Sequence, residues 1–311
     1  FAFAAGRLSL ETAEREGRTF RMLHRETDAA KVARNREAIF DLHASALAWL
    51  ERYTAAPYPW GKFDFLLVPS FQFGGMEHPG AIFYNAATLL LDPSATQNQK
   101  LGRASLIAHE TAHMWFGDLV TMRWWDDLWL NEGFASWMAS KGTSELHPEW
   151  KPWLQAVANS REAAMQLDAG AATHPVVQRV ESVDAVQMAF DAIAYNKGEA
   201  VIRMIEQAVG ETDFRAGIRS YMRKHAYSNT VTDDLWRELE SASGKPITAI
   251  AHDFTLQPGV PLVTVESAEC SAGMTKLTLT QSRFETDGRS AERVAWRIPI
   301  HARSIDGESD A

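Results

Sequence analysis

The sequence has little of what marks disulfide-rich, membrane-spanning or nucleic-acid-binding proteins. Cys270 is the single cysteine among 311 residues, so no disulfide can form within the chain. No apolar run approaches the roughly 18 to 20 residues that a membrane-spanning helix needs. The net charge of −9 and the lack of a basic stripe argue against nucleic acid as a partner. A chain of this length can still bury a sizeable core, and we expect one large domain with a smaller piece.

The chain also lacks an initiator methionine and a signal peptide. It begins at Phe1 with F-A-F-A-A-G-R-L-S-L, which is typical of the middle of a strand. We therefore expect the sequence to be truncated at its front, with any signal peptide in the missing part. A soluble protein is expected, a monomer is favoured, and the composition leaves the compartment open.

Apolar periodicity divides the first part of the chain into strands and a helix. Residues 1–26 alternate as strands do around a polar turn at 11–18, E-T-A-E-R-E-G-R. A long helix is expected from about Thr27 or Asp28, either of which could cap it, to Tyr53, before two prolines stop it. The β-rich run K-F-D-F-L-L-V-P-S follows at 62–70.

The second part of the chain is first helical and then strand-like. From 148 to 254 the pattern is helical, with caps and stops such as Gly210. The segment F-T-L-Q-P-G-V-P marks a boundary near 258–261. Beyond it, period-two alternation predicts the strands of a β-sandwich. Its apolar members are Leu277, Leu279, Val294, Trp296, Ile298 and Ile300.

The stretch H-E-T-A-H indicates a metal site. If residues 101–116 form a helix, His109 and His113 lie four residues apart on one face and can point two imidazoles at one ion. An H-E-x-x-H string arises by chance in roughly one chain in a hundred of this length, so the alternative of two ordinary histidines stands beside this reading.

A third ligand is available in the second helical segment, 127–140. Eighteen residues separate His113 from Glu132, and a turn between the two helices would bring its carboxylate to the same ion. Two histidines and one glutamate leave a coordination position open, as in catalytic rather than structural zinc sites. Glu110 would then be the base that takes a proton from water.

The continuous stretch from Leu106 to Ala135 resembles the zinc aminopeptidases of the aminopeptidase N and leukotriene-epoxide hydrolase family, which are gluzincin metallopeptidases. The resemblance rests on H-E-T-A-H, W-F-G-D-L-V-T and W-W-D-D-L-W-L-N-E-G-F-A. It implies one Zn²⁺ per chain held by His109, His113 and Glu132, with Glu110 as the general base.

A second informative stretch is F-Q-F-G-G-M-E-H-P-G, from 71 to 80. Gly74 and Gly75 remove side chains, so that another backbone, such as a substrate pairing with an edge strand, can approach closely. Alone, such a pair is more often a turn or a bulge. By resemblance, G-G-M-E is the exopeptidase signature, in which Glu77 binds the free α-amine of the substrate.

Neighbours of this signature are expected to contact substrate as well. By resemblance, Phe73 lines the pocket for the first side chain, and Met76 belongs to the same signature. His78 stands where the family usually has asparagine, and it can still donate a hydrogen bond to a substrate carbonyl. Asp118 also replaces a common asparagine, and we expect it to accept a hydrogen bond from a ligand imidazole.

A third stretch, F-D-A-I-A-Y-N-K-G, contains Tyr195. Taken by itself, this tyrosine is a half-buried packing residue near a helix start. The stretch is similar to the family segment in which a tyrosine hydroxyl faces the zinc site. The resemblance thus implies that Tyr195 stabilises the developing oxyanion, a contribution of about 3 kcal/mol to the barrier.

The expected fold class is α+β. By resemblance, residues 1–26 are the last strands of an otherwise missing β domain, 27–258 form a thermolysin-like catalytic domain with a mixed sheet, an edge strand and a mostly helical lobe, and 259–311 begin a β-sandwich. The helical domain that usually follows is absent.

The expected reaction is hydrolysis of the amino-terminal residue from peptides with a free amino terminus. Three alternatives stay open: an endopeptidase or an epoxide hydrolase on the same zinc site, and a non-catalytic zinc-containing binding module. The preferred amino-terminal residue is left open.

Overall fold

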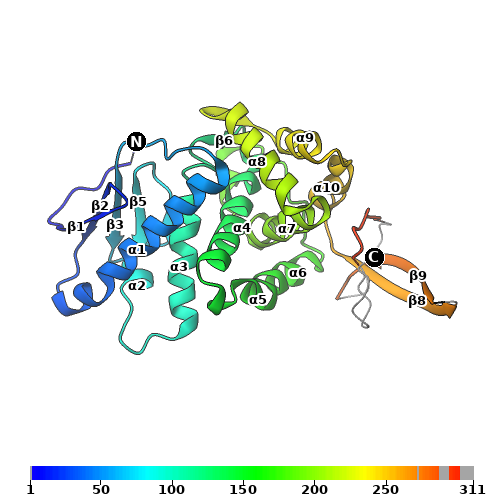
Figure 1. Ribbon diagram of the computed structural model, residues 1–311, viewed down its shortest axis with the longest axis horizontal. Helices are drawn as coiled ribbons and strands as arrows, with labels where there is room; N and C mark the ends of the chain where they lie inside the picture. Colours follow the sequence, from blue (N-terminus) through cyan, green and yellow to red (C-terminus); the bar gives the residue numbers. More distant parts are fainter. Residues whose placement is uncertain (1, 272, 287–293, 302–311) are drawn as a thin grey trace.

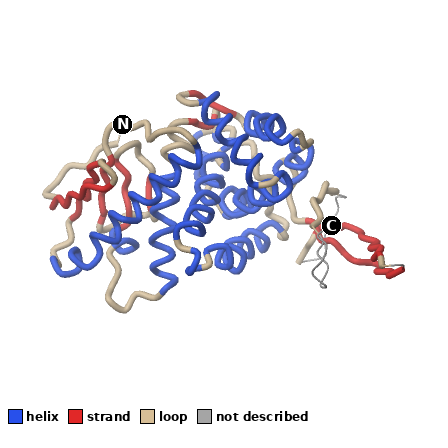
Figure 2. The backbone as a smooth tube through the Cα atoms, viewed as in Figure 1, coloured by secondary structure: helices blue, strands red, loops and turns tan. Residues whose placement is uncertain are grey.

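The computed structural model describes residues 2–271, 273–286 and 294–301. A small mixed sheet lies at one end, helices fill the middle, and a two-stranded hairpin extends from the other end (Figure 1; Figure 2). One apolar core runs continuously from the sheet into the helices. Among the described helices, none has the length and apolar character needed to cross a bilayer.

The mixed sheet has the strand order β1-β2-β3-β5-β4. Its members are β1 (Ser9–Arg15), β2 (Arg18–His24), β3 (Phe63–Val68), β4 (Gly75–Met76) and β5 (Ala81–Asn85). β2, β3 and β5 are parallel, whereas β1 and β4 run antiparallel to their neighbours. β4 is therefore an edge strand, which leaves backbone groups available to an extended peptide.

The expected polar turn at 11–18 is mostly strand, and the prediction is wrong there. Residues 11–15 belong to β1, and only Glu16 and Gly17, with φ of 50° and 75°, make the turn. β1 is the outer strand of the sheet, so its polar side chains remain in water. Because β2 pairs with β3, residues 9–24 share a sheet with the segment that follows, and their assignment to a preceding domain stays a prediction.

The helical body accounts for most of the chain. Its α-helices are α1 (Ala29–Thr54), α2 (Ala86–Leu89), α3 (Gln97–Ala112), α4 (Trp129–Leu146), α5 (Pro152–Gln155), α6 (Glu162–Asp168), α7 (Gly198–Val209), α8 (Glu211–His225), α9 (Thr232–Ser243) and α10 (Ile247–Thr255). Shorter 3₁₀ and π-helical turns are η1 (Trp125–Asp127), η2 (Pro148–Trp150), η3 (Ala156–Arg161), η4 (Val183–Ala189) and η5 (Ile193–Lys197). A parallel pair, β6 (Val120–Met122) and β7 (Ser228–Thr230), interrupts them.

Side-chain caps fix where two of these helices begin. Asp28 accepts two backbone amides at the start of α1, as its position in the sequence predicted. At the start of α3, Thr96 and Gln99 form a reciprocal capping box. α3 therefore begins four residues before the predicted segment 101–116, and it ends with His113 as its C-cap.

α4 is the central helix of the body. It packs against α3 on one side and against η5 and α7 on the other (Figure 1). A Cβ atom placed on Gly133 would lie 3.1 Å from the carbonyl oxygen of Ala194 and 3.2 Å from Cα of Gly198. Because no side chain separates the two backbones there, α4 and η5 approach closely.

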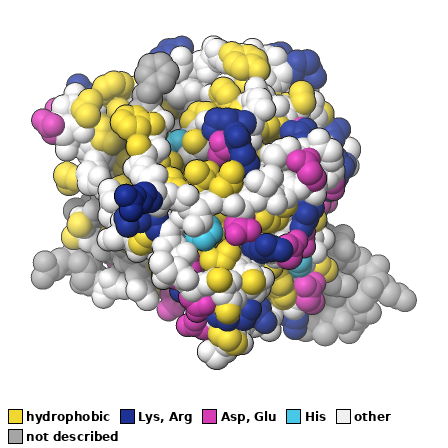
Figure 3. Space-filling view, turned by 90° about the vertical axis from the view of Figure 1, so that its left-hand side faces the viewer, with side chains coloured by type: hydrophobic (Ala, Val, Ile, Leu, Met, Phe, Trp, Pro, Cys, Tyr) yellow, Lys and Arg dark blue, Asp and Glu magenta, His cyan; other side chains and the backbone are white. Residues whose placement is uncertain are grey.

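Charged side chains of both signs are interspersed on the face of the molecule shown in Figure 3. No continuous basic surface crosses that face, which agrees with the net charge of −9. A nucleic-acid ligand would need a basic patch or stripe.

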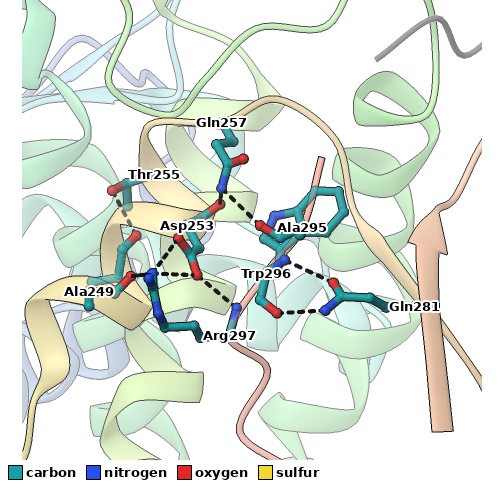
Figure 4. A network of polar contacts seen from close by, with 9 residues as sticks. Ala249, Asp253, Thr255, Gln257, Gln281, Ala295, Trp296 and Arg297 are labelled. Carbon is teal, nitrogen blue, oxygen red and sulfur yellow. Dashed lines mark hydrogen bonds and ion pairs between the residues drawn. The ribbon is translucent and has the colours of Figure 1, made fainter. Parts of the chain in front are cut away.

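The chain after 260 forms the hairpin of β8 (Pro261–Ser271) and β9 (Met274–Arg283). The predicted strand at 294–300 is wrong, because the described residues there have no regular structure. Trp296 is buried instead, and Gln281 both donates to and accepts from its backbone (Figure 4). Asp253 on α10 accepts the backbone amide of Arg297 at 2.7 Å. Side chains thus satisfy the backbone groups that a partner strand would have paired.

The close approach at Gly133 generates a stability prediction. Gly133→Ala should lower the free energy of unfolding by about 1–3 kcal/mol, because the added methyl group meets backbone atoms that cannot move easily. Gly102→Ala in α3 is the matched control. Nothing lies within 4 Å of its Cβ position, so the better helix former should stabilise by about 0.5–1 kcal/mol. Denaturant unfolding checks both, and equal effects would contradict the packing argument.

Candidate active site and metal centre

Two imidazole rings meet at the carboxyl end of α3. His109 lies in the last turn and His113 caps the helix, so the four-residue spacing places both rings on one face. Their Nε2 atoms are 3.1 Å apart, and the ring planes stand at 88° to each other. One nitrogen of each ring therefore points toward a common position.

Glu132 reaches the same position from the first turn of α4. Its Oε2 atom lies 3.3 Å from Nε2 of His109 and 3.3 Å from Nε2 of His113. The packing of α4 on α3 brings this carboxylate back to the histidines across eighteen intervening residues. The three residues form a group that could hold a metal ion.

These three atoms have the spacing that a tetrahedral zinc ion requires. Bonds of about 2.0–2.1 Å at tetrahedral angles separate neighbouring ligand atoms by about 3.3–3.4 Å. The observed separations are 3.1, 3.3 and 3.3 Å. Glu132 Oε2 is also buried without a hydrogen-bond donor among the described residues, which a cation would remedy. The residues therefore fit a metal with three protein ligands and one further position.

The remaining ring nitrogens orient the two imidazoles. Nδ1 of His113 lies 3.0 Å from the carbonyl oxygen of Phe116 and can only donate to it, so in the neutral ring Nε2 is the lone-pair atom. Nδ1 of His109 lies 3.4 Å from the hydroxyl of Ser136. The expected role of Asp118 is not seen: the acceptor for His113 is the Phe116 carbonyl, and Oδ2 of Asp118 has no partner among the described residues.

Glu110 lies beside the three candidate ligands and is 4 % exposed. Its carboxylate occupies the space next to β4, because a Cβ atom on Gly75 would be 2.3 Å from Oε1 of Glu110. The structure thus adds a reason for glycine at this position beyond the approach of a substrate. Oε2 of Glu110 has no hydrogen-bond partner in the described part of the chain.

Buried carboxylates dominate the electrostatics of this region. Burial raises the pKa of Glu110 to about 8 and that of Asp118 to about 8. Burial would lower the pKa of His113, but the carboxylates of Glu77 and Glu132 outweigh it and raise that pKa well above its usual value. So many acids around one point form an environment that a cation would stabilise.

The first part of the stretch around G-G-M-E faces the cavity, and the residue after it, His78, does not. Phe73, Gly74, Gly75, Met76 and Glu77 all line the cavity that contains the histidines. Oε1 of Glu77 lies 4.0 Å from Nδ1 of His113, the ring nitrogen that does not face the other candidate ligands, and Glu77 lines the same cavity as those ligands.

His78 is the predicted site residue that the structure does not bring to the others. It is not among the residues that line the cavity. Its ring packs edge-on against Phe83 of β5, with ring centroids 4.9 Å apart. Its contact with a substrate backbone stays a prediction without support from this geometry.

Tyr195 lies in η5 and lines the same cavity as β4. Its ring stacks on that of His109, with centroids 6.1 Å apart and planes at 16°. Burial, together with the charges of Glu132 and Glu77, raises the pKa of Tyr195 above its usual value. The phenol therefore stays neutral and can donate a hydrogen bond into the cavity.

The cavity itself has a volume of about 870 Å³ and extends beyond the predicted residues. Its deeper wall includes Glu199 and Ser140, which sequence reasoning missed. The Ser140 hydroxyl donates to Oε1 of Glu199 at 2.5 Å, and burial raises the pKa of Glu199 to about 7. The signal that could have found Glu199 is its spacing, four residues after Tyr195 on the same helical face.

Several curated proteins are similar to this chain. The "Probable aminopeptidase 2" of Sulfurisphaera tokodaii is 40% identical over 260 residues, 84% of this chain and 32% of that protein. The "Leucyl aminopeptidase" of Saccharolobus solfataricus is 38% identical over 274 residues, 88% of this chain and 34% of that protein. The "Aminopeptidase M1" of Arabidopsis thaliana is 41% identical over 266 residues, 84% and 29% of the two chains.

The chain spans about a third of the length of these relatives. The pattern of the peptidase family M1 domain matches residues 39–254, a segment that includes α3, α4 and η5 with the converging side chains described above. Since this match covers well over half of the sequence, the chain belongs to peptidase family M1.

Proposed function

We propose that this chain carries the active site of a zinc-dependent aminopeptidase, which hydrolyses the amino-terminal residue from peptides. The observation that carries the proposal is the position of Glu77. A carboxylate lies at the end of an edge strand, on the wall of the cavity that contains the three candidate ligands. A free α-amine paired with Glu77 would place the first peptide bond, and no later one, beside the metal position. The names of the similar proteins support this substrate class.

His109, His113 and Glu132 would hold the zinc ion. When bound, zinc would polarise the scissile carbonyl and lower the pKa of a water in the cavity. Glu110 accepts the proton of the attacking water and passes it to the leaving amine. The Tyr195 hydroxyl donates a hydrogen bond to the oxygen that gains negative charge. Gly75 and Met76 offer an edge strand along which the substrate backbone extends.

The finer architecture is also part of the proposal. Strands β3, β5 and the edge strand β4, together with the helical lobe, support a thermolysin-like catalytic domain within the proposed limits 27–258, although β1 and β2 of the same sheet precede these limits. The hairpin of β8 and β9 would begin a β-sandwich in 259–311. Its apolar residues are exposed, as expected of a sheet that a second sheet covers. These exposed residues include Leu262, Val263, Val265, Leu277 and Leu279.

The proposed activity predicts which substrates are cleaved. The full-length protein should release the chromophore from aminoacyl anilides with a free amine, and not from the same compounds after acetylation. A zinc chelator should abolish release, and added Zn²⁺ should restore it. Equal cleavage of acetylated substrates would replace the aminopeptidase with an endopeptidase. Bound zinc without any cleavage would favour the binding module or the epoxide hydrolase.

The contact between Gly75 and Glu110 predicts a catalytic defect. Gly75→Ala should lower kcat about 10- to 100-fold, because the added Cβ atom displaces the base from its position. Zinc content, measured by elemental analysis, should not change. Gly74→Ala is the matched control, since its Cβ atom would meet only Leu106, at 3.4 Å. Equal losses in both variants would mean that the methyl groups obstruct the substrate and leave Glu110 in place.

Tyr195→Phe removes the proposed hydrogen-bond donor and keeps the ring that stacks on His109. We expect kcat to fall about 100- to 1,000-fold with a smaller change in KM, because the donor acts on charge that exists only in the transition state. Steady-state kinetics on a free-amine anilide measure this split. A rise in KM at unchanged kcat would assign Tyr195 to substrate binding alone.

A further inference from the structure

His174 makes two short contacts that leave its ring no free nitrogen. Nδ1 lies 2.7 Å from the carbonyl oxygen of Pro175, and Nε2 lies 2.6 Å from Oδ2 of Asp191. Both partners are acceptors, so the ring must donate from both nitrogens and carries a positive charge. The ring and the carboxylate form an ion pair that is about three-quarters buried.

Asp191 uses its remaining acceptors on the turn that contains Tyr195. Its Oδ1 accepts the backbone amides of Ile193 at 2.9 Å and Ala194 at 3.1 Å. Its own carbonyl oxygen accepts the amide of Tyr195 at 3.1 Å. One residue thus satisfies three successive amides at the start of η5, where backbone groups have no helical partner.

The segment that holds His174 is itself fixed to the helical body. Val176 is buried in the main core, and the amide of Val177 donates to the carbonyl oxygen of Thr255 at the end of α10. His174 therefore connects an anchored segment to Asp191, and Asp191 connects to the turn of Tyr195.

We infer that His174 and Asp191 are positioning residues, which together set the place of the Tyr195 hydroxyl in the cavity. The inference rests on the proposed function, because it assigns Tyr195 its role in the reaction. Neither residue lines the cavity, so they act through Tyr195 and not on substrate. His174 lies outside the stretches that the sequence singled out for site residues, and Asp191 is the second residue of the stretch that contains Tyr195.

The charges around this pair make it sensitive to pH. The hydrogen bond to Asp191 raises the pKa of His174, and Asp168 on α6 adds to the rise. The positive charge of Lys197, whose Nζ lies 2.7 Å from Oδ2 of Asp168, opposes the increase in the pKa of His174 that Asp168 causes. Burial works to raise the pKa of Asp191, but the hydrogen bonds from His174 and from the amide of Ala194 lower it below its usual value.

The sign of the pH dependence follows from these directions. With a raised pKa, His174 contributes stability in full below its unfolded value of about 6.5 and loses it as the pH rises through the folded value. With a lowered pKa, Asp191 contributes above about 3.9 and loses this as the pH falls through its folded value. Both contributions are therefore fully present between about pH 4 and 6.5. They decline as the pH rises through the folded pKa of His174 or falls through the folded pKa of Asp191.

His252 and Asp233 provide a matched control. They form a second histidine–aspartate ion pair, between α10 and α9, with an N–O distance of 2.7 Å and no contact with the cavity. If an ion pair of this kind only adds general stability, His174→Gln and His252→Gln should have the same effects. If His174 positions Tyr195, only His174→Gln should change the reaction.

The test compares kcat, KM and the pH profile of kcat in five full-length variants, each loaded with zinc: His174→Gln, Asp191→Asn, His252→Gln, Tyr195→Phe and the double variant Tyr195→Phe/His174→Gln. His174→Gln should lower kcat about 10- to 100-fold with little change in KM. It should also remove the decrease in kcat at alkaline pH that is due to the titration of His174. Asp191→Asn keeps a capping acceptor but loses the charge, so its decrease in kcat should be smaller than that of His174→Gln. In a Tyr195→Phe background, His174→Gln should have almost no further effect. The same fold loss with and without the Tyr195 hydroxyl would overturn the inference, as would an equal loss in His252→Gln.

Hydrogen exchange separates this inference from the proposed function. Amides of 192–198 should exchange faster in His174→Gln than in the parent protein, and at the parental rate in His252→Gln. This measurement needs no substrate. If the protein cleaves no peptide, the proposed function fails. Unchanged hydrogen exchange at 192–198 in His174→Gln would overturn the inference that the His174–Asp191 pair holds the turn of Tyr195.

Discussion

The convergence of three candidate ligand atoms from two helices is the constraint on which the rest of the site depends. Nε2 of His109, Nε2 of His113 and Oε2 of Glu132 lie within 3.1–3.3 Å of one another. Two of these atoms belong to one helix, so local geometry fixes their spacing. The third comes from α4, and its place depends on how that helix packs on α3. A shift of one ångström between the two helices would open the triangle that a zinc ion needs.

The same packing explains why the acids are tolerated. Glu110 and Glu132 are almost fully buried, and both have a carboxylate oxygen without a hydrogen-bond partner among the described residues. Such groups destabilise a fold when they stand alone. A cation at the centre would balance them, so folding and metal binding should be coupled in this protein. Gly75 makes room for one of these carboxylates, and an aliphatic and aromatic core surrounds the region.

Residue patterns predicted the elements that carry the site better than its details. The strand at 63–68 and the helix that begins after Asp28 were predicted from periodicity and capping, and both are confirmed. The segment 11–15 was predicted to be a turn because it is polar. It is part of β1, an outer strand, whose side chains can face water and need not be apolar. The alternation at 294–300 predicted a strand, yet Gln281 and Asp253 satisfy its backbone instead. Period-two patterns record burial on one side, and they do not show which groups the backbone pairs with.

The sequence by itself determined the local part of the candidate site: the four-residue spacing of His109 and His113 and the acid beside them follow from the order of residues along one helix. Only the tertiary structure decided which distant groups meet them. It brought Glu132 and Tyr195 to the cavity, turned His78 toward Phe83, and placed His174 beside Asp191. The physical reason is that helical spacing acts over a few residues through the backbone, whereas these contacts depend on how whole helices and strands pack.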